Sequence, residues 1–167
     1  MPEYQGLTFS ALETPTLAKW NQLWENDAFF YDPNRLYVDE QLDTDITGIS
    51  TTWTPVFNKN IITTVDNEVL DISVTVACLK KTASGWCAIK LQIDDTDTLV
   101  DLSYCPSENW VHLHLNHKHI QTLQGTVNVK VLARPQNNSM TVDAIHDVNG
   151  LIQATQLQVM SMGGESS

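Results

Sequence analysis

The sequence predicts a mainly β protein, an antiparallel β-sandwich or jelly roll preceded by one N-terminal amphipathic helix. Between residues 53 and 160, roughly eight short apolar segments are separated by turn residues, and no helical pattern lies between them. One helical pattern occurs, ahead of all these segments. With 167 residues and 42% hydrophobic composition, the chain is large enough for one domain with a real core.

The helix is predicted over residues 15–27. Thr14 is a suitable N-cap, and Pro15 suits the first helical position. Apolar side chains then recur at steps of three and four, at Leu17, Trp20, Leu23 and Trp24. A stripe with two tryptophans must pack on its own domain, on sister subunits or on another protein. Because the helix lies ahead of the β region, we expect these four side chains to be assembly contacts.

The central stretch of the chain, residues 69–93, has the period of two that is typical of strands with one buried face. Apolar residues alternate with polar ones from Val69 to Cys78 and again from Cys87 to Ile93. The intervening segment holds two lysines, a serine and a glycine, which favours a turn. We therefore predict a β-hairpin with both apolar faces on one side. A hairpin alone is barely stable in water, so a second sheet must cover that face.

The other predicted strands fall into one β domain. They cover residues 53–57, 60–65, 99–104, 110–115, 127–132, 140–145 and 157–160. The expected organisation is an arm, helix and linker over residues 1–45, a sandwich over 46–162 and a disordered tail over 163–167.

The charge of the chain argues against two classes of partner. Nine basic residues stand against 20 acidic ones, which gives a formal net charge of -11. Such a chain repels phosphate backbones and anionic lipid headgroups, so we expect no nucleic acid and no membrane as partner. The first ten residues lack the basic start and apolar core of a secretion signal, and a non-secreted protein is expected. Phosphate-cradling glycine motifs are absent, and no cofactor is expected.

Three cysteines, at positions 78, 87 and 105, make an odd count without C-x-x-C spacing. Neither a disulfide framework nor a zinc site follows from this pattern. Cys78 and Cys87 occupy inward-facing positions of the predicted hairpin, where they could face each other and pair. Small buried thiols are the more common case, and we expect both to be reduced.

Four histidines are clustered at positions 112, 114, 117 and 119. On a strand, His112 and His114 share one face, so three copies around a threefold axis could bring six imidazoles to one metal ion. The alternative is a strand whose solvent-facing positions happen to be histidine. Lys118, between His117 and His119, disfavours a cation there. We assign no metal ligand.

Other candidate chemistry is weak. The acidic run Asp94, Asp95, Asp97 and Asp101 offers hard oxygen ligands but lacks EF-hand spacing, so a solvated loop is the simpler interpretation. Asp143, His146 and Asp147 have no accompanying nucleophile, and we assign no catalytic residue. Five tryptophans, at 20, 24, 53, 86 and 110, are many for this length. Exposed aromatic side chains on a sandwich could stack on sugar rings, whereas buried or interfacial packing is their more frequent use.

Two parts of the chain resemble known proteins. The segment TPTLAKWNQLW, residues 14–24, resembles a short helical segment near the N-terminus of bacteriophage virion appendage proteins. The segments IKLQIDD (89–95), LQGTVNVKV (123–131) and LQVM (157–160) look like the closing strands of trimeric jelly-roll domains on phage heads and tails.

The resemblance implies a non-enzymatic virion structural protein, made in the host cytoplasm, that decorates a capsid or belongs to a head fibre or tail appendage. It also implies a homotrimer in contact with other virion proteins, with a host surface glycan as a further partner. The main alternative is a carbohydrate-binding β-sandwich module, and a third is a small hydrolase on the same scaffold.

Overall fold

Twelve β-strands contain most of the residues that this computed structural model describes, which are 20–21, 36–80, 83–148 and 151–164. The strands are β1 Leu36–Gln41, β2 Ile46–Ile49, β3 Thr54–Ile62, β4 Glu68–Leu79, β5 Gly85–Ile93, β6 Thr96–Cys105, β7 Trp110–Gln121, β8 Thr126–Pro135, β9 Met140–Asp143, β10 Ile145–Val148, β11 Leu151–Ala154 and β12 Gln156–Gly164. Trp20 and Asn21 are the only helical residues among those described.

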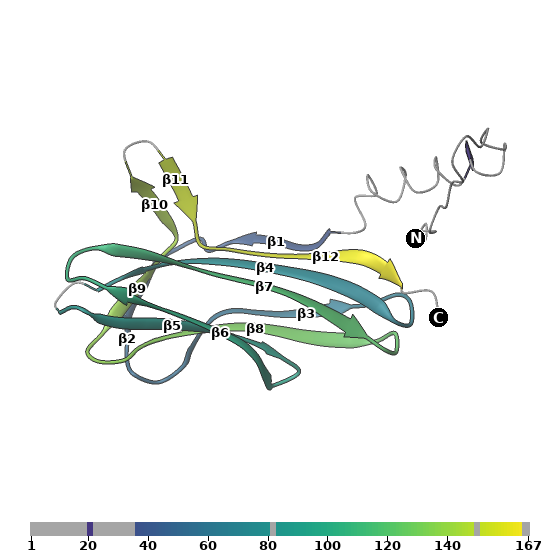
Figure 1. Cartoon of the computed structure of the whole chain (residues 1–167), viewed down its shortest axis with the longest axis horizontal. Coiled ribbons are helices and arrows are strands. Elements are labelled where there is room, and N and C mark those ends of the chain that lie inside the picture. Colours follow the sequence, from purple (N-terminus) through teal and green to yellow (C-terminus); the bar gives the residue numbers. More distant parts are fainter. Residues whose placement is uncertain (1–19, 22–35, 81–82, 149–150, 165–167) are drawn as a thin grey trace, which may run out of the picture.

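The strands form two antiparallel sheets that face each other, so the predicted β-sandwich is confirmed (Figure 1). Sheet A has the order β1-β12-β4-β9-β2, with β7 on the other side of β4. Sheet B has the order β3-β8-β5-β6. The separate β10–β11 hairpin projects away from the sandwich on the side of sheet A (Figure 1).

The strand pairs are nested within one another along the chain. The innermost pair is β5 with β6, followed by β4 with β7, β3 with β8, and β2 with β9. These four pairs alternate between sheet B and sheet A, and the outermost pair, β1 with β12, joins sheet A. The described chain is therefore a long two-stranded ribbon rolled up on itself, and each sheet gathers pairs that are distant in sequence.

The hairpin predicted over residues 69–93 is wrong, although both of its strands exist. β4 belongs to sheet A, where β7 takes one edge and β12 and β9 share the other, while β5 lies between β6 and β8 in sheet B. Their apolar faces meet across the sandwich instead of lying side by side. After β4, the buried Lys80 donates from Nζ to the backbone carbonyl and side-chain Oδ1 of Asn137, between β8 and β9. The residues between β4 and β5 connect sheet A to sheet B. A polar sequence with a glycine is typical of such connections as well as of tight turns, so the sequence did not distinguish the two.

The core between the sheets follows the predicted alternation. On β4, Leu70, Ile72, Val74, Val76 and Cys78 are buried, and on β5 the same is true of Cys87, Ile89, Leu91 and Ile93. Leu113 and Leu115 of β7 and the odd-numbered residues 127–133 of β8 complete the layer. All three cysteines are buried and free.

The sandwich extends beyond the residue bounds expected for it. β1 begins at Leu36 and pairs with β12, so part of the expected linker is a strand of sheet A. β12 continues to Gly164, within the expected tail. The helix predicted over residues 15–27 lies outside the described residues, apart from Trp20 and Asn21.

Candidate functional site

The outer face of sheet B is the surface of the described chain where aromatic, apolar and polar side chains meet. Because the odd-numbered residues of β5 and β8 fill the core, the even-numbered ones point outward. Cross-strand pairing aligns Trp86 with Tyr104, and Ala88 with both Leu102 and Arg134. One end of this face, around Trp86, is aromatic, while the other, at the β5–β6 turn, is polar.

At the aromatic end, Trp86 and Tyr104 form an edge-to-face pair with ring centroids 5.8 Å apart and an interplanar angle of 78°. Their side chains are 43% and 51% exposed, and Leu102 and Val100 beside them are 55% and 52% exposed. Exposed apolar groups that are contiguous, as these are, mark interaction surfaces.

A pocket of about 380 Å³ opens beside Trp86. Its lining comes from the β2–β3 loop, β5, β6 and the end of β8, and consists of Thr51, Trp86, Ala88, Leu102, Arg134, Pro135 and Gln136. The amide of Gln136 donates a hydrogen bond of 2.8 Å to the carbonyl of Trp86, which holds the β8–β9 turn against β5. The pocket thus combines an apolar wall with a guanidinium, an amide and a hydroxyl group, the composition typical of small-ligand sites.

Trp53 contacts two cations next to this pocket. Lys90 Nζ lies 4.8 Å and Arg134 Cζ 4.6 Å from the centroid of its ring. The contact is of the cation–π type and holds the half-buried indole of the β2–β3 loop on the outer face of sheet B. Thr51, which lines the pocket, belongs to the same loop.

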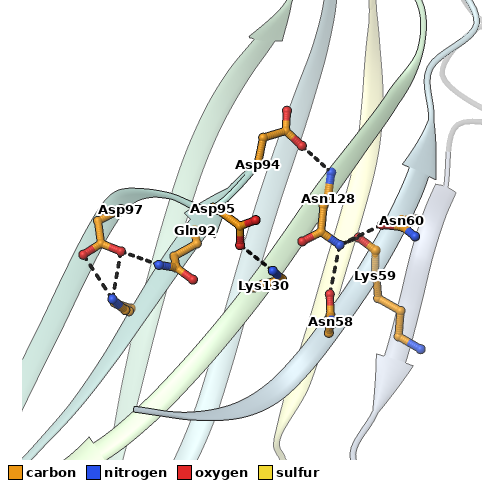
Figure 2. Close-up of polar contacts among 10 residues, drawn as sticks. Asn58, Lys59, Asn60, Gln92, Asp94, Asp95, Asp97, Asn128 and Lys130 are labelled. Carbon is orange, nitrogen blue, oxygen red and sulfur yellow. Dashed lines mark hydrogen bonds and ion pairs between the residues drawn. The ribbon is translucent and has the colours of Figure 1, made fainter. Parts of the chain in front are cut away.

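The polar end of the face is built on the β5–β6 turn (Figure 2). Asp94 and Asp95 have positive φ values of 48° and 64°, the conformation of a tight hairpin turn. Asp94 Oδ1 accepts a hydrogen bond of 2.8 Å from the amide of Asn128, and Asp95 forms an ion pair with Lys130. The acidic run is therefore tied to β8 by hydrogen bonds, beyond the plain solvated loop that its sequence suggested.

Asp97 continues this polar network. Its carboxylate accepts from Lys90 Nζ at 2.8 Å and from Gln92 Nε2 at 2.6 Å. The hydrogen bond from Lys90, followed by that from Gln92, lowers the pKa of Asp97. On β8, Asn128 Nδ2 donates to the side-chain oxygens of Asn58 at 2.9 Å and Asn60 at 2.7 Å, across to β3 (Figure 2). Carboxylates and amides are thus fixed in place along this end.

The histidines do not form a single cluster. Their register against β4 places His112 and His114 on the outer face of sheet A, and His114 Nδ1 lies 3.1 Å from Thr75 Oγ1. His117 and His119 have the opposite orientation, because they pair with inward-facing residues of β4. Within the described ranges, no three His, Cys, Asp or Glu side chains are grouped as metal ligands would be.

The other candidates from the sequence belong to different elements. Asp143 ends β9, whereas His146 and Asp147 belong to β10. Of the four expected assembly contacts, Trp20 is described and exposed, and Leu17, Leu23 and Trp24 lie outside the described residues. Among the described residues, no helix is long and apolar enough to cross a membrane.

Sequence reasoning missed most of the pocket. In the sequence Trp86 is one of five tryptophans, and no motif distinguishes Thr51, Arg134 or Gln136. The alternation of β5 did carry a signal, since Trp86 is out of phase with the buried Cys87 and must face outward. Trp86 pairs with Tyr104 of the neighbouring strand β6, but the polar residues of the pocket come from the end of β8 and from the β2–β3 loop, which no local pattern links to β5.

No protein-family model matches the chain, and no curated protein matches it. Among solved structures, the EclA C-terminal domain, a sugar-binding protein, is similar at 14% identity over 64% of this chain and 72% of that chain, with a TM-score of 0.35. Dimeric latent PorU from Porphyromonas gingivalis is similar at 10% identity over 76% of this chain and 13% of that chain, also with a TM-score of 0.35. Similarity at this level carries no argument about function.

Proposed function

We propose that this protein is a non-enzymatic jelly-roll module that binds a carbohydrate on the outer face of sheet B. The observation that carries the proposal is the exposed Trp86–Tyr104 pair at the pocket that Arg134 and Gln136 line. The nested strand pairing, which alternates between a six-stranded and a four-stranded sheet, supports the jelly-roll assignment.

The chemistry of the pocket matches that of a sugar ring. A pyranose presents apolar C–H groups on its faces and hydroxyl groups around its edge. An aromatic side chain supplies flat apolar area with little loss of conformational entropy, and it suits the face of the ring. The donors of Arg134 and Gln136 and the hydroxyl of Thr51 suit the edge of the ring, because each makes directional hydrogen bonds.

The scaffold holds these groups in place before a ligand arrives. Trp86 and Arg134 are on paired strands, and the Gln136 amide is bonded to the Trp86 carbonyl. The ring of Trp53 contacts the Arg134 guanidinium, with 4.6 Å between Cζ and the ring centroid. Preorganised groups lose less entropy on binding, so a modest pocket can bind a polar ligand.

The proposal is tested by titrating the full chain with a panel of free monosaccharides and glycan fragments while indole and amide NMR signals are recorded. Trp86→Ala should abolish binding. The matched control Ile120→Ala removes an exposed apolar side chain from sheet A and should bind as the parent does. Failure of the parent chain to bind any member of the panel, or equal binding by Trp86→Ala, refutes the proposal.

A second candidate, a virion structural protein that assembles as a homotrimer, is favoured by the apolar row that includes Tyr104 and continues along β6 beyond the pocket. Val100, Leu102 and Tyr104 form an exposed apolar row on β6, the edge strand of sheet B. Together with the expected stripe on the N-terminal helix, such a row suits contacts between subunits or with other virion proteins.

Solution mass tests this second candidate. Val100 does not line the pocket, so Val100→Lys separates assembly from ligand binding. We expect a trimer for the parent chain, with weakened association in Val100→Lys and in the double variant Trp20→Ala/Trp24→Ala. A monomeric parent chain, or a trimer untouched by either variant, eliminates this candidate.

A further inference from the structure

The cations on the outer face of sheet B differ in how they are paired. Lys90 forms an ion pair with Asp97, and Lys130 forms one with Asp95. Arg134, on the same face, has no carboxylate of the described chain within ion-pair distance, although the sequence carries 20 acidic residues. The guanidinium of Arg134 instead makes a cation–π contact with the ring of Trp53.

From this difference we infer that the pocket binds a sugar that bears a carboxylate, with Arg134 as the counter-ion of that carboxylate. The inference rests on the proposed carbohydrate-binding function and names the class of its ligand. A guanidinium presents five N–H donors in a fixed fork, which matches the two oxygens of a carboxylate. Hydrogen bonds of this bidentate, charge-assisted kind are stronger than those between neutral groups.

The surroundings of Arg134 favour such a contact. Arg134 Cζ lies 4.6 Å from the centroid of the Trp53 ring, and an attraction to the ring does not use up the five N–H donors of a guanidinium. The backbone of Arg134 is fixed by its pairing with Ala88, and the side chain lines the pocket. Asp97, a neighbouring acid on this face, is already engaged by Lys90 and Gln92 and does not compete for the guanidinium.

The rest of the pocket restricts which carboxylates fit. Trp86, Ala88 and Leu102 form an apolar wall that a small carboxylate such as acetate would leave uncovered. A volume of about 380 Å³ lies within the range of ~300–1,000 Å³ typical of small-ligand sites. Gln136 and Thr51 add hydrogen-bonding groups for hydroxyls. Uronic acids and sialic acids both combine a ring, hydroxyl groups and one carboxylate.

The net charge of -11 opposes any anionic ligand at long range. Binding must therefore come from short-range contacts with Arg134. Salt screens both the repulsion and the attraction between the protein and an anionic ligand. Added salt weakens the repulsion by the whole chain as well as the attraction to the guanidinium, so the salt dependence should be shallow. The discriminating variable is the charge of the ligand itself.

The test compares three probes with the full chain by NMR titration: the methyl glycosides of glucuronic acid, of its methyl ester and of glucose. The methyl glycoside of N-acetylneuraminic acid is added to distinguish sialic acid from uronic acid. We expect the acid to bind at least about tenfold more tightly than its ester, as charge-assisted hydrogen bonds imply. Arg134→Gln should remove this preference, whereas the matched control Lys118→Gln, on sheet A, should retain it.

Arg134→Lys guards against a misfolded variant, since it keeps a cation for the ring of Trp53 but removes the bidentate fork. It should retain the indole signals of the parent chain and lose most of the preference for the acid. If the parent chain binds acid, ester and glucose equally, the inference is overturned while the carbohydrate proposal stands. If it binds acetate or an acidic peptide as tightly as the glucuronide, the inference is overturned as well. If the parent chain binds none of the sugars, both proposals are overturned.

Discussion

Asp101 Oδ2 accepts a hydrogen bond of 3.2 Å from the main-chain amide of His114, and this contact joins the two sheets along one open side of the sandwich. Asp101 is on β6 of sheet B, in register with the buried Ile89, while His114 is on β7 of sheet A. In the described chain β7 pairs only with β4, so its other edge carries unpaired backbone groups. An inward-pointing carboxylate at an edge is a known protection against strand-to-strand association.

The opposite side of the sandwich has an equivalent contact. Lys59 of β3 in sheet B forms an ion pair with Glu40 of β1 in sheet A. Both residues are partly exposed, so the pair itself contributes little free energy. Its position matters more, since charged groups at both open sides disfavour the addition of a further strand.

Asp101→Ala should make the protein associate with itself. The substitution leaves the His114 amide without its acceptor and exposes part of the β7 edge. We expect a loss of about 1 kcal/mol in the free energy of unfolding, typical of one hydrogen bond, together with a higher mean mass in sedimentation velocity. Asp101→Asn keeps an acceptor oxygen and is the control. If Asp101→Ala matches the parent in both measurements, the contact has no protective role.

Along one edge of β4 the pairing strand changes from β12 to β9, and Thr155 lies at this change. β12 pairs with β4 up to Thr75, and β9 begins its pairing at Ala77. The fully buried Thr155 Oγ1 accepts from the Ala77 amide at 3.0 Å and donates to the Asp143 carbonyl at 2.6 Å. Its own amide donates to the carbonyl of Ala144 at 3.0 Å. One hydroxyl thus replaces the sheet hydrogen bonds that the β10–β11 excursion interrupts.

Thr155→Val should destabilise the sandwich, although the two side chains are close in shape. A buried amide and a buried carbonyl each lose a partner, and a buried group without a partner costs about 1–3 kcal/mol. Thr155→Ser retains the hydroxyl and should lose less, mainly through the missing methyl group. Urea unfolding followed by tryptophan fluorescence measures both variants. If the free energy of unfolding of Thr155→Val equals that of Thr155→Ser, the hydroxyl of Thr155 has no bridging role.

Glu68 and Tyr37 form a partly buried polar contact in sheet A. Glu68 is fully buried at the start of β4, and its Oε1 accepts a hydrogen bond of 2.7 Å from the Tyr37 hydroxyl. Its Oε2 accepts a hydrogen bond of 2.9 Å from the amide of Thr64. Burial, followed by the hydrogen bond to Glu68, raises the pKa of Tyr37 from 10.0 to about 12.

The raised pKa of Tyr37 predicts a loss of stability at alkaline pH. The folded state retains the phenolic proton more tightly than the unfolded state does, so its contribution is fully present below the ordinary pKa of 10.0. It is lost as the pH rises from 10 through about 12. Urea midpoints measured at pH 9, 10 and 11 should therefore fall, and Tyr37→Phe should flatten the decline. Tyr104→Phe, which changes an exposed tyrosine, should leave it unaltered.

Burial within each strand of this fold is encoded locally, whereas the pairing of the strands is not. Alternation on β4 and β5 correctly predicted which residues are buried, because the period of a strand is independent of its neighbours. The same pattern could not show that Cys78 and Cys87 lie on opposite sheets, since an apolar face packs equally well against its own hairpin or a facing sheet. That Trp86 and Thr51 line one pocket depends on how the ribbon rolls, and the sequence around either residue does not show it.

The three cysteine thiols are buried. Cys78 of β4 is buried opposite Cys87 of β5 and Cys105 of β6. Contact with the Cys87 thiol, and after that burial, raises the pKa of Cys78, while burial raises that of Cys105. The same contact lowers the pKa of Cys87. A raised pKa lowers the fraction of reactive thiolate at Cys78 and Cys105, whereas Cys87 is protected by its complete burial, which excludes the reagent.

We therefore expect iodoacetamide to leave all three thiols unlabelled in the folded protein and to label all three in denaturant, as counted by intact mass. At a low urea concentration, labelling should proceed only as fast as the sandwich opens, because both sheets cover the cysteines. Tyr37→Phe, which weakens sheet A, should then speed labelling in proportion to its loss of stability. Rapid labelling of Cys78 in the native protein, or a mass lower by two protons than that of the reduced chain, would show that the thiols are accessible or paired.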